Sequence, residues 1–259
     1  MTAPPAEPAA PTPDPADPRT PLMDRVKEAL MALPGYFNST TNIEGIEARD
    51  LFALNTMLGT TIEVQVVNTL NRIRDVWDPN DEWPLYRFDR QAQTFPDVLL
   101  RRQLDSGDFD VALGIELKGW YVLSKEAEPS FRYTVTPAAC ADWDLLAVVP
   151  WHLSNVLSGV PRVDSPGIWS AQHAAKYRNY WWQHIRDTQA DRSITSPEIE
   201  VPYRKRSNTS DRPAYDGGGN FGRIARIGIM NSWTKEILNR RLAGIPARGW
   251  IEFLKIHAS

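Results

Sequence analysis

The amino-acid sequence predicts a mixed α/β (α+β) fold, in which helices flank a central mixed β-sheet behind a disordered N-terminal tail. Apolar residues recur at helical spacing between residues 22 and 77. A cluster of short segments rich in Val, Ile, Leu and aromatic residues follows between residues 95 and 149. Helical spacing returns after residue 169. This order of helices, strands and helices is typical of mixed α/β and α+β proteins.

Residues 1–21 consist almost entirely of Pro, Ala, Thr and acidic residues. Proline lacks the N–H that helices and sheets require, and the segment has almost no large apolar side chains to bury. We therefore expect a disordered tail rich in polyproline II conformation.

Three helices are predicted before the strands, over residues 22–33, 46–58 and 60–77. The first ends at Pro34-Gly35 and the second near Gly59, because proline and glycine commonly end helices. The third begins at Thr60-Thr61-Ile62-Glu63, which matches a capping box with Thr60 as the N-cap and Glu63 reaching back to it.

The strand-like segments share short length and a high content of β-branched and aromatic residues, and cover 95–101, 110–123, 131–136 and 145–149. The last is entirely apolar, as is typical of a buried strand. A short helix is expected between the last two, at 137–143.

In the C-terminal third, predicted helices alternate with irregular segments. Its predicted elements are a helix with an aromatic stripe at 169–185, a polar loop at 193–222, a helix at 229–242 and a closing strand or helix at 250–256. The aromatic stripe favours packing, with Trp181 in the core.

Composition excludes several classes of protein. The 259 residues include 29 Lys and Arg against 32 Asp and Glu, so net charge gives no argument for nucleic-acid binding, although a local cleft can still be basic. A single cysteine, Cys140, excludes a disulfide framework and a multi-cysteine metal site. The apolar runs are too short to span a bilayer, and the N-terminus does not resemble a signal peptide. We expect a soluble, cytoplasmic protein.

Two short motifs carry the chemistry: Pro96-Asp97 and Glu116-Leu117-Lys118. Residues two apart in a strand share a face, so Glu116 and Lys118 point the same way while Leu117 points into the core. If the strands that hold the two motifs pair, Asp97 approaches Glu116. Two carboxylates on a rigid sheet make a hard oxygen site suited to Mg²⁺, beside an amine that can orient or deprotonate a water.

The two motifs resemble those of the PD-(D/E)XK nuclease superfamily, which includes type II restriction endonucleases. The resemblance covers about residues 46–150 and implies a restriction-endonuclease-like core of helix, three meandering strands, helix and strand. Residues 22–259 would then form one nuclease domain, with 151–259 contributing DNA contacts or dimerisation. The family often places an acidic residue on the helix before the motif, and Glu63 is the best match.

The resemblance implies a metal-dependent endonuclease that hydrolyses phosphodiester bonds in DNA, most naturally double-stranded DNA. Asp97 and Glu116 would hold Mg²⁺, for which Mn²⁺ can substitute, with the carbonyl of Leu117 as third ligand. Lys118 would handle the attacking water, and Glu63 would bind a second ion. A homodimer is expected, since two-fold symmetry presents one site to each strand. The implied role is restriction or another defence against foreign DNA.

Several alternatives stay open. The enzyme could serve DNA repair or recombination, or the fold could be a non-catalytic DNA or protein interaction module in which Glu116 and Lys118 form an ordinary surface pair. Glu63 could act only as a helix cap. Asp110 is the fallback ligand if Asp97 points away.

Basic residues in the polar loop are candidate phosphate contacts. They are Arg204, Lys205 and Arg206, followed by Arg223 and Arg226, and on the helix predicted at 169–185 Arg178 and Asn179 are further candidate DNA contacts. Between Arg206 and Arg223, Gly217 to Gly222 contains a formal G-x-G-x-x-G, but no strand precedes it, so we expect no nucleotide cofactor.

Overall fold

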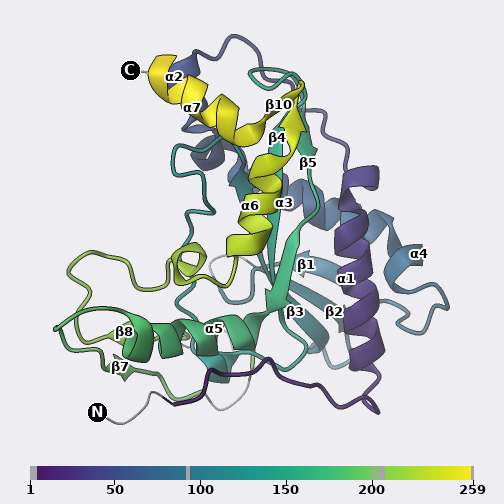
Figure 1. Ribbon diagram of the computed structural model, residues 1–259. Coiled ribbons are helices and arrows are strands. Elements are labelled where there is room, and N and C mark those ends of the chain that lie inside the picture. The colour runs from purple at the N-terminus through teal and green to yellow at the C-terminus, as the bar shows by residue number, and fades with distance from the viewer. Residues whose placement is uncertain (1–4, 92–93, 200–201, 204–207, 258–259) are drawn as a thin grey trace.

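The computed structural model describes residues 5–91, 94–199, 202–203 and 208–257. It shows a mixed α/β fold in which helices flank a curled central sheet (Figure 1). Within these ranges, no helix is both long enough and apolar enough to cross a membrane.

The N-terminal half begins with helices. They are α1 (Arg19–Tyr36), α2 (Ala48–Leu51), α3 (Leu54–Arg72) and α4 (Arg74–Trp77). The predicted break between 46–58 and 60–77 is wrong, because α3 continues through Gly59 and Thr60. Gly59 is buried against the sheet, where its carbonyl oxygen would lie 3.4 Å from a Cβ added to Gly119. This glycine therefore allows close packing of helix on strand, and Thr60 is not an N-cap.

Within the described part of the chain, the main sheet has six strands. They are β1 (Arg87–Arg90), β2 (Val98–Gln103), β3 (Phe109–Tyr121), β4 (Leu145–Leu153), β5 (Pro161–Val163) and β6 (Gly167–Ser170). The first three form an antiparallel meander, β4 runs parallel to β3, and both β5 and β6 pair antiparallel with β4. The predicted strands at 95–101, 110–123 and 145–149 thus correspond to β2, β3 and β4.

The predicted strand at 131–136 does not form, and the structure shows only an isolated bridge between Val135 and Ser210. A buried arginine takes the place of a strand on one side of this segment. Arg178 Nη1 donates to the carbonyl oxygens of Tyr133 and Val135, at 2.7 and 2.9 Å, while on the other side Thr134 and Thr136 form backbone hydrogen bonds with residues 209–211.

The remaining elements cover the sheet. They are the 3₁₀ helices η1 (Pro137–Ala139) and η3 (Ile224–Ile227), the helices α5 (Ala171–Tyr180), α6 (Asn231–Asn239) and α7 (Ala247–His257), the π-helical turn η2 (Trp181–Ile185), and the short strands β7 (Ile194–Thr195), β8 (Arg212–Pro213), β9 (Arg241–Leu242) and β10 (Ile245–Pro246). The closing segment at 250–256 is therefore a helix. Trp233 of α6 packs against Trp120 of β3 and Trp169 of β6.

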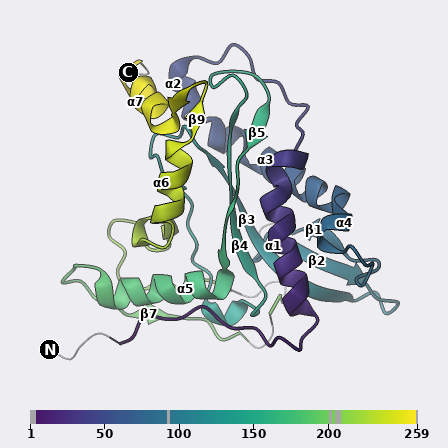
Figure 2. The same ribbon diagram turned by 45° about the vertical axis from the view of Figure 1, so that its right-hand side comes forward.

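The N-terminal tail is predicted to be disordered, whereas the structure gives residues 5–18 a defined path. This segment runs alongside α5 before it enters α1 (Figure 2). His173 Nε2 lies 3.0 Å from the carbonyl oxygen of Pro8.

Candidate active site

The two predicted motifs meet where β2 and β3 separate. The pairing of β2 with β3 begins at Val98 opposite Ile115. β3 nevertheless continues for six residues to Tyr121, paired only with β4 on its other side. One edge of β3 is thus open from residue 116 onward, and backbone groups pointing to that edge need other partners.

Three side chains supply these partners. Leu117 N–H donates to Oδ2 of Asp97 at 3.2 Å, Gly119 N–H donates to Oε1 of Glu63 at 3.3 Å, and Tyr121 N–H donates to Oδ1 of Asn55 at 2.9 Å. Alternate N–H groups of β3 are therefore bound by a residue just before β2 and by two residues of α3. Asp97 and Glu63 are held along the same strand edge as a result.

Lys118 joins the two carboxylates of the motif. Its Nζ lies 2.6 Å from Oδ2 of Asp97 and 2.9 Å from Oε1 of Glu116. The side chains of Lys118 and Asp97 keep 22% and 25% of their surface exposed, whereas Glu116 keeps 10%. A ligand from solvent can therefore reach the lysine and the aspartate, while Glu116 forms the floor of the site.

Burial is the largest single influence on the pKa values of the ionisable side chains at the site. It raises the pKa of Glu116 to about 7, with a further contribution from the negative charge of Asp97. Burial likewise raises the pKa of Glu63. For Lys118 burial opposes the charge, but attraction to Glu116 and Asp97 outweighs it and raises the pKa, so the amine is an ammonium at neutral pH.

The donor set fits a hard divalent cation. The N–H and C=O of a strand residue point to the same side, so the carbonyl of Leu117 faces the open edge with its N–H and with Asp97. Two carboxylates and a carbonyl are oxygen ligands of the kind Mg²⁺ uses together with water. Among the described residues, no group of three or more His, Cys, Asp or Glu side chains is arranged to hold a metal.

No family model, curated protein or solved structure matches this chain. The site must therefore be interpreted from its own geometry.

Glu63 is not a helix cap. It lies in the interior of α3, and its carboxylate reaches the edge of β3 and approaches Arg90 of β1, with Arg90 Nη2 and Glu63 Oε2 3.7 Å apart. The fallback ligand Asp110 lies elsewhere, where it accepts hydrogen bonds from the hydroxyl of Tyr86 and from Arg102.

The structure describes only part of the set of candidate DNA contacts, and the described ones do not contact the site around Lys118 through any of the hydrogen bonds or ion pairs given above. Arg204, Lys205 and Arg206 lie outside the described residues. Arg226 is exposed and forms an ion pair with Glu128 at 2.6 Å, and Arg223 is half-buried. Arg178 is buried and bonded to Asp211, so its interpretation as a DNA contact is wrong.

The prediction that Trp181 packs in the core is partly right, because Trp181 is half-buried whereas its neighbour Trp182 is fully buried. Sequence reasoning missed Asn55 and Arg90 at the site. Asn55 precedes Glu63 by eight residues, which is a same-face spacing once α3 is known to be continuous.

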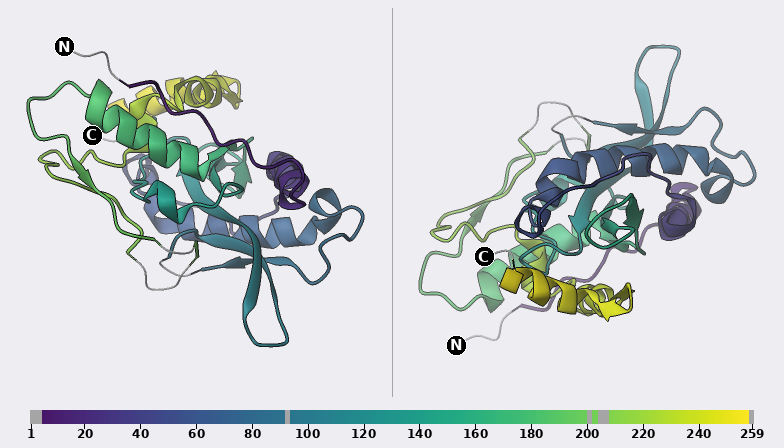
Figure 3. Two further views of the ribbon diagram at one scale, coloured as in Figure 1. Left: turned by 90° about the horizontal axis from the view of Figure 1, so that it is seen from below. Right: turned by 90° about the horizontal axis from the view of Figure 1, so that it is seen from above.

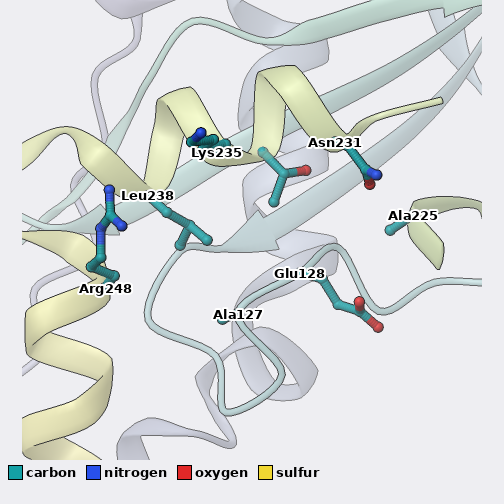
Figure 4. Close-up of a pocket in the computed structure, with 8 residues that line it drawn as sticks. Ala127, Glu128, Ala225, Asn231, Lys235, Leu238 and Arg248 are labelled. Carbon is teal, nitrogen blue, oxygen red and sulfur yellow. The ribbon is translucent and has the colours of Figure 1, made fainter. Parts of the chain in front are cut away.

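A separate hollow of about 250 Å³ lies between α6, the start of α7 and the turn after β3 (Figure 4). Ala127, Glu128, Asn231, Lys235 and Arg248 are among its lining residues. It shares no residue with the site around Lys118, so it does not extend that site.

Proposed function

We propose that the chain is a Mg²⁺-dependent endonuclease that hydrolyses phosphodiester bonds in double-stranded DNA. The observation that carries the proposal is the placement of the Lys118 ammonium within hydrogen-bonding distance of both Asp97 and Glu116, where β3 leaves β2. An ammonium held between two acids on a rigid strand is suited to stabilising charge on a phosphate.

Each residue has a defined task in this proposal. Asp97 and Glu116, with the carbonyl of Leu117, would hold Mg²⁺ or Mn²⁺, and Glu63 would contribute to a second ion. When bound, such an ion neutralises the carboxylates, polarises a phosphate oxygen and activates water. Lys118 donates hydrogen bonds to the attacking water and the scissile phosphate, and its positive charge offsets the charge that develops there.

We propose further that the enzyme acts in restriction or another defence against foreign DNA, as a homodimer that presents one site to each strand. DNA repair or recombination is the alternative role. A non-catalytic interaction module on the same fold is the alternative class of function. The PD-(D/E)XK resemblance and the convergence of its three charged residues support an enzyme over that module.

Plasmid cleavage tests the proposal. Supercoiled DNA is incubated with the wild-type chain with and without Mg²⁺, and with Asp97→Asn and Lys118→Met. We expect Mg²⁺-dependent linear or nicked product from wild type and a loss of at least ~10³-fold in rate for both variants, because each removes a group that acts on the reacting phosphate.

Asp105→Asn is the matched control, since Asp105 lies exposed in the turn between β2 and β3. It should cleave like wild type, and circular dichroism should show all variants folded. Equal cleavage by wild type and the two site variants, or none by any across methylated, unmethylated and branched DNA, would remove the enzymatic proposal.

A further inference from the structure

A row of aromatic rings runs along one side of α5 and into η2. Its members are His173, Tyr177, Tyr180 and His184, spaced four, three and four residues apart, which places them on one helical face. Consecutive ring centroids are 6.1, 6.3 and 5.4 Å apart, so the rings contact one another in sequence. None is fully buried, and the row forms a ridged aromatic surface.

The tail that lies beside α5 has a matching period. Pro5, Pro8 and Pro11 recur every third residue, and a polyproline II helix has three residues per turn, so the three prolines share one side. Pro8 and Pro11 are half-buried, whereas Pro5 and the intervening Ala9 and Ala10 are exposed. The tail therefore turns a proline side toward the protein, and the views from two directions place it along α5 (Figures 2 and 3).

Specific contacts connect the tail to the row. The carbonyl of Pro8 can only accept, so His173 Nε2 carries the hydrogen that it donates across 3.0 Å. Burial and the negative charge of Glu7 raise the pKa of Tyr177, so this tail residue lies within electrostatic range of the second ring.

The other end of the tail is also fixed. Arg19, the first residue of α1, stacks over the ring of Trp143, and the Trp143 Nε1–H donates to Oγ1 of Thr20 at 3.2 Å. A segment anchored at both ends is held close to its surface, which raises its effective concentration there.

We propose that the aromatic row on α5 is a recognition surface for proline-rich polyproline II segments, and that residues 5–13 of the same chain occupy it as an intramolecular ligand. Rows of aromatic rings bind such segments in other systems because rings fit between prolines and hydrogen-bond donors meet the free carbonyls. The polyproline II segment is already extended before binding, so it loses little conformational entropy when it docks.

A spin label on the tail tests the proposal in the full-length chain. Cys140 is the only natural cysteine and is buried, so Ala9→Cys provides one accessible thiol on the exposed side of the tail. Continuous-wave EPR then reports the mobility of the label. In the otherwise wild-type chain we expect an immobilised spectrum.

Removing the surface should release the tail. With His173→Ala and Tyr177→Ala together, we expect the correlation time of the label to fall about tenfold, toward that of a free chain segment. Tyr36→Ala, which removes an exposed tyrosine from α1, is the matched control and should leave the spectrum unchanged. Pro8→Ser with Pro11→Ser should release the label without touching the folded core.

A competing peptide tests the class of ligand. Excess peptide with the sequence of residues 3–15 should mobilise the label, and a peptide with alanine in place of its prolines should not. A label already mobile in wild type, or one that stays immobile in both the ring and the proline variants, would overturn the proposal. Equal displacement by the two peptides, or by neither, would overturn recognition of polyproline II structure.

Discussion

At the scale of one residue, Glu116 shows that a side chain suited to binding a cation is costly to keep ionised in the folded protein. Its carboxylate lies beside Asp97 and is shielded from water, so ionisation is costly and its pKa rises to about 7. The Lys118 ammonium, 2.9 Å away, compensates for only part of this cost. A carboxylate in such surroundings gains most from a cation that binds it.

The pH dependence of stability follows from this pKa. A carboxyl whose pKa is higher in the folded than in the unfolded chain binds more protons when folded, so stability falls as pH rises from about 4.5 toward 7. Glu116→Gln removes that titration. Between pH 5 and pH 8, the free energy of unfolding of wild type should therefore fall by about 2 kcal/mol relative to that of Glu116→Gln.

Urea denaturation of both proteins at the two pH values, without divalent cations, measures this shift. Glu126→Gln, in the turn after β3, is the control and should follow wild type at both pH values. A constant difference between wild type and Glu116→Gln would mean that Glu116 does not titrate in this range.

Single residues also show what sequence can predict. Strand periodicity places Glu116 and Lys118 on one face, whereas the approach of Asp97 depends on the pairing of β2 with β3, which the sequence suggests only as a condition. The position of Glu63 does not follow from such local rules. Its spacing from Thr60 fits a cap, and only the packing of α3 on β3 shows that the helix is continuous there.

At the scale of elements, α3 packs closely along the open edge of β3. Asn55 and Glu63 are eight residues apart on α3, a rise of about 12 Å, whereas the N–H groups that they bind, of Tyr121 and Gly119, are two residues apart on β3, a span of about 7 Å. The two side chains therefore converge on a short stretch of the strand, and Gly59 between them allows the two backbones to approach.

Asn55→Ala tests the contact between α3 and β3. The change leaves the N–H of the buried Tyr121 without its partner, and a buried unsatisfied donor costs about 1–3 kcal/mol. We expect urea denaturation to show a loss of that size. Asn68→Ala, at an exposed position of the same helix, should change stability by less than ~0.5 kcal/mol. Equal effects of the two substitutions would contradict the proposed role of Asn55.

The segment at 131–136, predicted to be a strand, shows a limit of predicting secondary structure from local sequence. Its alternating sequence is compatible with a strand, but a strand inside a sheet needs partners on both sides, and here the carbonyls of Tyr133 and Val135 on one side are bound by Arg178, more than forty residues away. Local pattern cannot reveal such a distant partner.

For the molecule as a whole, Arg178 connects distant parts of the chain. From α5 it reaches the segment at 133–135 and the buried carboxylate of Asp211 near β8. The sequence predicts the order of helices and strands, because that order depends on local periodicity. It does not predict this connection or the placement of the tail on α5, since both depend on side chains meeting across more than thirty residues.

Arg178→Met should therefore destabilise the whole fold. Removing one partner leaves the buried Asp211 without its counter-charge, which typically costs about 3–5 kcal/mol. Thermal denaturation should show a lower midpoint for this variant, whereas Lys176→Met, at an exposed position of α5, should stay near wild type. A wild-type midpoint for Arg178→Met would show that the pair is not structural.

The side chains along the open edge of β3 also hinder the pairing of this edge with a strand of another molecule. An uncovered strand edge offers a template to which an extended segment of another molecule can add, which is a common first step of aggregation. Asp97, Glu63 and Asn55 occupy the donors of that template, and two of them carry carboxylates. Two of the groups proposed to hold the ion thus also block the addition of a further strand at this edge, so variants that lack them should aggregate more readily.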